Sequence, residues 1–158
     1  MQDNTQTGAG RRYLLLPLFI LLVIGGGALI GATNTPGPWY DGLQKPGFTP
    51  PDWLFGPVWT GLYILIAIAG WRIWRAGDST LKALWAAQMA LNFLWSPIFF
   101  TAHMLGLALV VIVMLLAVIV AVAWRARRAD RAVSWLFLPY LLWVSYAALL
   151  NAALVWLN

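Results

Sequence analysis

The chain has 158 residues, of which 62% are hydrophobic and 9% are charged, with a formal net charge of +5. This composition excludes a water-soluble globular domain, because a core of this size could not bury so much apolar surface, and it indicates an integral membrane protein. The chain has no cysteine and a single histidine, which excludes a disulfide framework, a thiol nucleophile and an iron–sulfur or cysteine-based zinc site.

Five apolar runs are each long enough to cross a bilayer, which takes about 20 helical residues. They predict an all-α integral membrane protein, a five-helix transmembrane bundle forming one domain (12–158) after an N-terminal tail (1–11). The expected helices lie near residues 12–32, 54–76, 80–101, 104–125 and 132–157. The third and fourth runs are nearly continuous, but Pro97 and a combined length of ~45 residues favour a tight turn over one long helix.

The cations mark an orientation rather than a nucleic-acid surface. Nine of the ten lie in the tail or near the second and fourth connections, whereas the first loop contains only Lys45, with Asp41 and Asp52. By the positive-inside rule, the N-terminus is cytoplasmic, and the first loop and the C-terminus are external. We therefore expect a multi-pass membrane protein with the lipid bilayer as a partner and no nucleic acid.

The first loop, residues 33–53, differs from the other connections. It contains five prolines and three glycines beside Trp39, Tyr40 and Phe48. So many fixed φ angles predict an ordered, Pro/Gly-rich external lid, although a rigid connector with interfacial aromatic residues would have the same composition.

Helical rise places several aromatic and amide residues at similar depths beneath this loop. At about 1.5 Å per residue, Trp59 lies ~9 Å below Trp53, and Tyr63 lies one turn deeper. The third helix brings Asn92 and Trp95 into the same half of the membrane, with Gln88 on the Asn92 face. The fifth helix brings Trp143, Ala147, Leu150 and Asn151 to comparable heights. Equal depth permits one shared pocket.

Two interpretations remain open for the polar and aromatic side chains in the spans. The amides of Gln88, Asn92 and Asn151 should point into the bundle, either toward a ligand or as hydrogen bonds between helices. Six tryptophans near span ends are expected to form interfacial belts: Trp71, Trp74, Trp85, Trp124, Trp135 and Trp156. The deeper tryptophans are expected to form a ligand cage with Trp53 at its rim: Trp59, Trp95 and Trp143.

The remaining features predict no acid–base or metal chemistry. Leu105–Ala123 of the fourth span is aliphatic, so we expect no site on that helix, and Gly25–Gly27 lie in a run expected to face lipid. All five acids lie in the tail or the loops, and His103 lies in an external turn, where a solvated loop histidine is favoured over a haem ligand. Small residues permit close helix packing at Ala83, Ala87 and Ala90 and at Gly27 and Gly31.

Four sequence blocks resemble the tryptophan-rich sensory protein family, also called TspO or translocator protein. They are Trp39 to Pro46, Pro50 to Tyr63, Gln88 to Phe100 and Pro139 to Asn151. The resemblance implies a five-helix bundle, usually a homodimer through helix 3 (Ala83, Ala87, Ala90), with no required cofactor or metal. It implies a porphyrin or tetrapyrrole ligand beneath the first loop, held by Trp39, Tyr40, Trp53, Phe55, Trp59, Tyr63, Gln88, Asn92, Trp95, Phe99, Trp143, Ala147, Leu150 and Asn151.

The resemblance also bears on activity. Trp59 and Trp143 match family tryptophans linked to light-dependent porphyrin breakdown, which needs no acid–base group, so we leave open whether the protein is an enzyme. Gly47 and Phe48 stand where some relatives carry tryptophan, and the cholesterol motif of animal members is absent from residues 151–158. The sequence favours a stress-related membrane receptor or sensor. The alternatives are a transporter of porphyrin or small apolar solutes and a purely structural partner protein.

Overall fold

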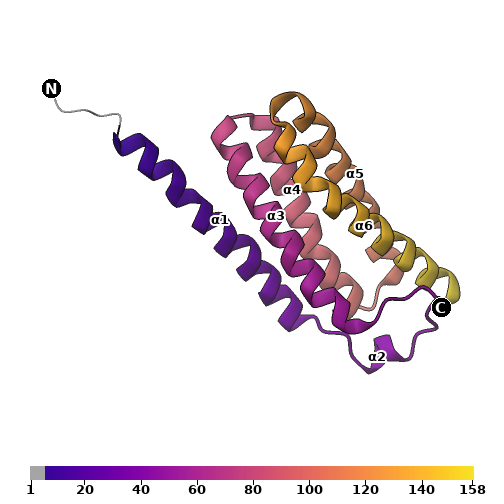
Figure 1. The fold of residues 1–158 in the computed structure, drawn as a ribbon. Coiled ribbons are helices and arrows are strands. Elements are labelled where there is room, and N and C mark those ends of the chain that lie inside the picture. Colours follow the sequence, from indigo (N-terminus) through magenta and orange to yellow (C-terminus); the bar gives the residue numbers. More distant parts are fainter. Residues whose placement is uncertain (1–5) are drawn as a thin grey trace.

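The computed structural model describes residues 6–158, with side chains from Leu15 onward. Its long elements are all helices, and no strand occurs in the described part (Figure 1). The five long helices are α1 (Gln6–Thr33), α3 (Phe55–Ala76), α4 (Ser79–Ser96), α5 (Leu105–Ala129) and α6 (Arg131–Leu157). Each contains a segment long and apolar enough to cross a membrane. The predicted all-α, five-helix membrane architecture is confirmed, and the protein is a multi-pass membrane protein.

Short elements occupy the connections. The four-residue helix α2 (Pro38–Asp41) and the 3₁₀ turn η1 (Asp52–Leu54) lie in the loop between α1 and α3. A π-helical turn, η2 (Pro97–Thr101), follows α4, and α5 begins after a turn in which His103 has a φ of 58°. The predicted break near Pro97 is confirmed. The predicted tail includes residues 1–5, which lie outside the described residues, and α1 is already helical from Gln6.

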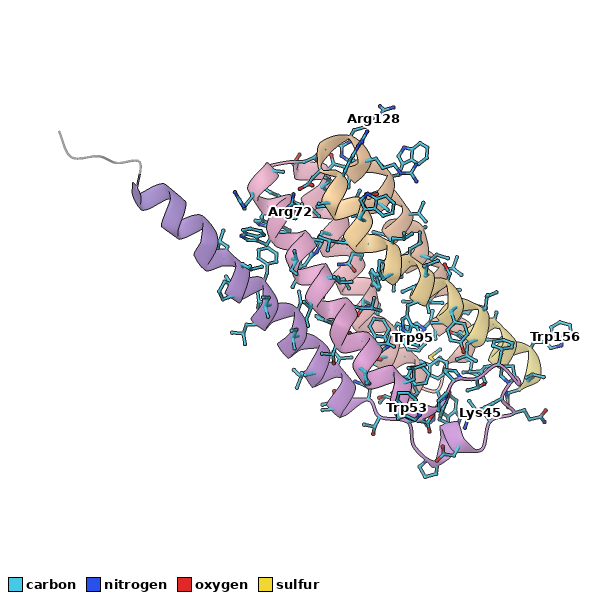
Figure 2. All side chains as sticks on the ribbon, in the orientation of Figure 1. Lys45, Trp53, Arg72, Trp95, Arg128 and Trp156 are labelled. Atoms are coloured by element: carbon cyan, nitrogen blue, oxygen red, sulfur yellow. The ribbon has the colours of Figure 1, made fainter. Side chains whose placement is uncertain are left out.

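The two ends of the bundle differ in their side chains. Figure 2 shows Arg72 and Arg128 at one end, with Lys45, Trp53 and Trp156 at the other. We call these the arginine-rich end and the lid end. The C-terminus lies at the lid end, beside the loop that contains α2 (Figure 1).

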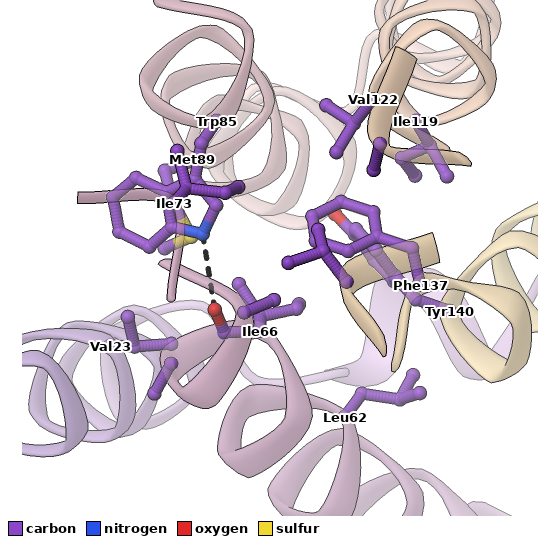
Figure 3. Packing of buried hydrophobic residues seen from close by; sticks show 14 of the residues in the cluster. Val23, Leu62, Ile66, Ile73, Trp85, Met89, Ile119, Val122, Phe137 and Tyr140 are labelled. Atoms are coloured by element: carbon purple, nitrogen blue, oxygen red, sulfur yellow. Dashed lines mark hydrogen bonds between the residues drawn. The ribbon is translucent and has the colours of Figure 1, made fainter. Parts of the chain in front are cut away.

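The core lies where α3 packs against α1 and α6, and where α5 packs against α4 and α6. Figure 3 shows buried aliphatic and aromatic side chains meeting there, among them Ile66, Ile119 and Phe137, each with no exposed surface. These residues close the interior between the arginine-rich end and the middle of the bundle. Close packing of this kind leaves little room for a ligand in that half.

Trp85 belongs to this core, so its assignment to an interfacial belt is wrong. It is only 9% exposed, and its indole nitrogen donates a hydrogen bond to the Ile66 carbonyl oxygen at 3.0 Å (Figure 3). Gly70 makes the approach possible, because a Cβ there would lie 2.6 Å from the Trp85 ring. Trp74 packs edge-on against Trp85, at 5.4 Å between ring centroids. By contrast, Trp124, Trp135 and Trp156 are exposed near helix ends, as belt residues should be.

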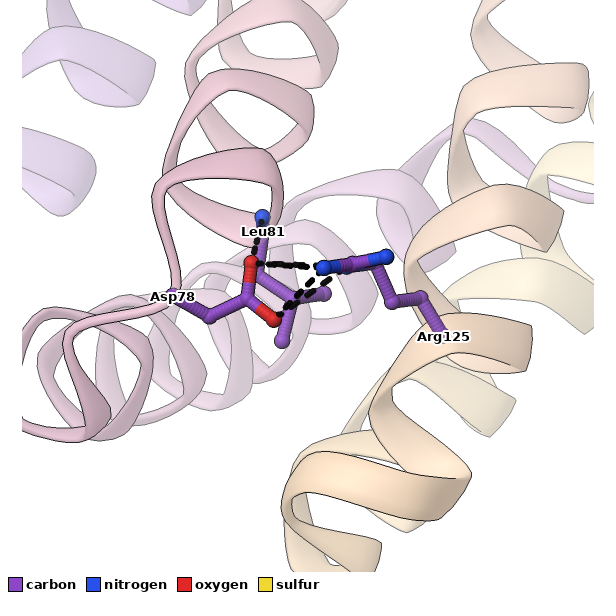
Figure 4. A network of polar contacts seen from close by, with 3 residues as sticks. All are labelled: Asp78, Leu81 and Arg125. Carbon is purple, nitrogen blue, oxygen red and sulfur yellow. Dashed lines mark hydrogen bonds and ion pairs between the residues drawn. The ribbon is translucent and has the colours of Figure 1, made fainter.

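Two ion pairs fasten the connections at the arginine-rich end. The Asp78 carboxylate caps α4 by accepting from the Leu81 amide at 3.0 Å, and it pairs with Arg125 at 3.0 Å (Figure 4). The Leu81 amide and the Arg125 guanidinium together lower the pKa of Asp78. Asp130 similarly pairs with Arg72 at 2.8 Å. Burial works to raise the pKa of Asp130, but hydrogen bonding and charge from Arg72 outweigh it and lower the pKa.

Candidate ligand-binding cavity

The loop of residues 34–54, which we call the lid, is joined to the helices at several points. At its start, the Thr101 hydroxyl donates to the Asn34 side-chain oxygen at 2.5 Å. Trp39 stacks on His103, with ring centroids 4.1 Å apart and 16° between the planes. These contacts hold the first half of the lid against the turn between α4 and α5.

The second half of the lid is bound to α6. The Asn158 side chain accepts from the Gln44 amide at 2.9 Å and donates to the Gln44 carbonyl oxygen at 3.1 Å. The Tyr146 hydroxyl donates to the Phe48 carbonyl oxygen at 2.6 Å. Backbone groups of the lid therefore find side-chain partners on the bundle, which gives this irregular segment a defined path.

A cavity of ≈520 Å³ lies beneath the lid, between all five long helices. Its volume falls within the range of ~300–1,000 Å³ typical of small-molecule sites. The following expected site residues line it: Tyr40, Phe55, Trp59, Tyr63, Asn92, Trp95, Phe99, Trp143, Ala147, Leu150 and Asn151. The structure therefore places the deep indoles of α3, α4 and α6 around one space.

Three expected site residues do not line the cavity. Trp53 is 72% exposed at the lid end, and Trp39 is engaged with His103 outside the lining. Gln88 is fully buried in α4, and neither of its amide atoms has a hydrogen-bond partner among the described residues. His103 also lies outside the lining, so the cavity offers a porphyrin iron no histidine.

Two helices that supply none of the expected site residues contribute to the wall. α5 supplies Ile112 and Leu115, so the expectation that this helix contributes nothing does not hold. α1 supplies Ile24, Gly27, Ala28, Ile30 and Gly31. The other unanticipated lining residues are Asn34, Pro36, Asp52, Gly56, Thr60, Ser96, Phe100, Val144 and Leu154.

Two glycines of α1, Gly26 and Gly27, pack against other helices rather than facing only lipid. A Cβ at Gly27 would overlap the Tyr63 ring, and a Cβ at Gly26 would lie 2.7 Å from the Phe93 ring. The absence of side chains at both positions lets α1 approach α3 and α4 closely. The four-residue spacing of Gly27 and Gly31 was the sequence signal, but only Gly27 meets a neighbouring helix, because a Cβ at Gly31 would have open space around it.

Two of the amides in the cavity wall, Asn92 and Asn151, make hydrogen bonds between helices. The Tyr63 hydroxyl donates to the Asn92 oxygen at 3.0 Å, and the Asn92 nitrogen donates to the Tyr140 hydroxyl at 2.8 Å. Asn151 accepts from the Trp95 indole at 3.2 Å and donates to the Leu105 carbonyl oxygen at 3.1 Å. Asn92 and Asn151 therefore form the hydrogen bonds between helices that were one of the two interpretations of their amides, and both side chains also line the cavity.

Trp143 differs from the other indoles of the wall. Its indole nitrogen is buried and has no acceptor among the described residues. The ring packs edge-on against Phe55 at 5.9 Å and is tilted against Tyr146 at 5.7 Å. A buried, unpaired N–H is costly, and a bound molecule with a hydrogen-bond acceptor would relieve that cost.

The edge of the cavity next to the lid contains the neutral phenol of Tyr40 and the acidic side chain of Asp52. Burial raises the pKa of Tyr40, and the nearby Asp52, Tyr146 and Asp41 raise it further. The Lys45 ammonium lies 4.4 Å from the centre of the Tyr40 ring. Tyr40 therefore stays protonated at neutral pH and lines the cavity as an aromatic surface with a polar hydroxyl. Within the described residues, no group of three or more metal-ligating side chains occurs.

These features define the class: a multi-pass helical membrane protein with a ligand-sized, aromatic-walled cavity at one end of its bundle. Residues 19–157 match the profile of the TspO/MBR family. The chain belongs to this family, which confirms the resemblance identified from the four sequence blocks.

Individual relatives agree along nearly the whole chain. The chain is 37% identical over 142 residues to the tryptophan-rich sensory protein of Cereibacter sphaeroides, covering 89% of this chain and 90% of the relative. It is 40% identical over 149 residues to the tryptophan-rich protein TspO of Archaeoglobus fulgidus, covering 92% and 96%. It is 39% identical over 121 residues to the human translocator protein, covering 72% and 70%.

Proposed function

We propose that this protein is a membrane receptor or sensor that binds porphyrins in the aromatic cavity beneath the lid. Membership of the TspO/MBR family and the names of its relatives, sensory protein and translocator protein, support a membrane sensor or receptor. The observation that supports a flat aromatic ligand is the convergence of Trp59, Trp95 and Trp143 on one cavity. Indole and phenyl faces stack well against planar conjugated rings.

Trp59 and Trp143 are the residues that we assign to light-dependent porphyrin breakdown. Both line the same cavity, on α3 and α6 respectively. In that reaction molecular oxygen is the oxidant and the photoexcited porphyrin ring is oxidised: one O2 adds across a double bond of the ring, which cleaves to two carbonyl groups, and the indoles hold the ring in place without a net change in their own oxidation state. Such a reaction requires no general acid, base or metal from the protein.

The proposed arrangement in the membrane follows the charges and the small residues. The lid end faces the outside of a bacterial cytoplasmic membrane, and the arginine-rich end faces the cytoplasm. Ala83, Ala87 and Ala90 lie exposed on α4, where close approach of a second copy would form a homodimer. The packed core between the cavity and the arginine-rich end counts against a transporter with a continuous path through the bundle.

The test is titration of protoporphyrin into detergent-solubilised protein, followed by aerobic illumination of the complex. Trp59→Phe and Trp143→Phe should each weaken binding about three- to tenfold, as expected for loss of ~0.5–1.5 kcal/mol of aromatic contact. Both should also slow loss of the porphyrin absorbance. Trp124→Phe is the matched control, because Trp124 is exposed at the opposite end. Equal effects of all three changes would contradict the proposed cage.

A further inference from the structure

The arginine-rich end holds most of the protein's net charge. Among the residues whose side chains the structure describes, its cations are Arg72, Arg75, Lys82, Arg125, Arg127, Arg128 and Arg131, and its acids are Asp78 and Asp130. At the lid end, Lys45 faces two acids, Asp41 and Asp52. The field at the arginine-rich end is therefore strongly positive, and its membrane leaflet should be enriched in anionic lipid.

A hollow of ≈360 Å³ lies within this charged surface, where the start of α4 meets the end of α5. It is lined by Asp78, Trp124, Arg125, Arg128 and Ala129. The hollow is at the opposite end of the bundle from the aromatic cavity, as the position of Arg128 in Figure 2 shows.

The two arginines of the hollow differ in their pairing. Arg125 is held by the Asp78 carboxylate, with Nη2 3.0 Å from Oδ2 (Figure 4). Arg128 has no acid partner in the part of the chain that the structure describes. The Arg127 guanidinium lies 5.0 Å from the centre of the Trp124 ring, beside the hollow. The two arginines and one aspartate of the lining leave one net positive charge, which Arg128 carries. Its planar guanidinium can form two parallel hydrogen bonds to a phosphate.

An apolar stripe on α5 leads from the hollow toward the membrane centre. Val113, Ala117, Val120 and Trp124 recur at three- or four-residue spacing and are all exposed. Trp124 is 66% exposed, and Val120 one turn deeper is 48% exposed. A guanidinium beside an exposed indole, continued by an aliphatic stripe, matches the order of headgroup, interface and acyl chain in a phospholipid.

We propose that this hollow binds the phosphate of an anionic phospholipid, with Arg128 as its main cationic ligand and the acyl chain along the Val113–Trp124 stripe. The stripe distinguishes a lipid from a free phosphate ion, because an inorganic ion would gain nothing from exposed valines and an indole. This site is independent of porphyrin binding, and its failure would leave the proposed function intact.

The experiment is native mass spectrometry of the detergent-solubilised protein supplied with phosphatidylglycerol or phosphatidylcholine. The wild-type protein should retain one phosphatidylglycerol in preference to phosphatidylcholine. Arg128→Gln should lower retention about fivefold, the equivalent of ~1 kcal/mol for one cation near an anionic headgroup. Arg131→Gln is the matched control, because Arg131 is an exposed cation at the same end that does not line the hollow.

Two further arms make the result decisive. Trp124→Ala should also lower lipid retention, since it removes the interfacial wall, and it tests the site without changing a charge. Inorganic phosphate in millimolar excess should not displace the lipid. Equal losses of lipid retention in Arg128→Gln and Arg131→Gln would mean that the overall positive charge of this end, rather than the hollow, retains the lipid, and would overturn the proposal. So would displacement by inorganic phosphate, or wild-type retention in both Arg128→Gln and Trp124→Ala.

Discussion

Replacing Asn92 with leucine should destabilise the bundle, because Asn92 joins three helices through two hydrogen bonds. It accepts from Tyr63 of α3 at 3.0 Å and donates to Tyr140 of α6 at 2.8 Å. Hydrogen bonds between membrane helices are each worth ~0.6–1.7 kcal/mol. Leucine has a similar volume, so Asn92→Leu should lower the free energy of unfolding by about 1–3 kcal/mol with little change in packing.

Tyr63→Phe removes one of the two bonds and should cost roughly half as much. The double change Tyr63→Phe with Asn92→Leu should cost less than the sum of the two single changes, because both remove the same contact. Reversible unfolding in mixed detergent micelles, followed by circular dichroism, gives the free energies. Leu94→Ala is the control, since Leu94 lies on the same helix and is 49% exposed. Additive effects, or an Asn92→Leu protein as stable as wild type, would refute this role for Asn92.

Three other outcomes follow from the structure. Gly27→Ala should destabilise the protein in thermal unfolding because its Cβ overlaps the Tyr63 ring, whereas Gly25→Ala, with open space around it, should be neutral or stabilising by up to ~1 kcal/mol. Because the folded-state pKa of Asp130 is lowered, its ionised form stabilises the fold fully above the unfolded-state pKa of ~3.9. This stabilisation should disappear as the pH falls through the lower folded-state pKa. Arg72→Gln should abolish the effect, and acid titration of the melting temperature measures it. Ala87→Phe should disrupt the proposed homodimer and leave a monomer in light scattering of detergent complexes, while Met114→Phe, also on an exposed face, should not.

Part of the candidate site could be predicted because depth along a helix is a one-dimensional quantity. Residue count and helical rise alone placed Trp59, Trp95 and Trp143 in one half of the membrane, and the structure brings all three to one cavity. The lid could also be predicted from local sequence, since its prolines limit this segment to short helical turns such as α2 and prevent a long helix.

The sequence did not predict whether each side chain points into the cavity, into the core or toward lipid. Gln88 and Asn92 are one helical turn apart, yet only Asn92 lines the cavity. Trp85 has the sequence position of a belt residue, but Gly70 on α3 opens a buried place for its ring. In each case the outcome depends on a residue of another helix, which no local pattern reports.

Three properties can be predicted from the amino-acid sequence alone: the number of spans, the lid between the first two spans and the depth of each indole in the membrane. Hydropathy and proline content fix these properties locally, before any helix meets another. Three other properties appear only when the helices pack together: α1 and α5 complete the cavity wall, Trp85 joins the core, and Arg128 lies in a hollow. The physical reason is that lipid and protein interior are both apolar, so a membrane helix carries little periodic signal of which side faces its neighbours.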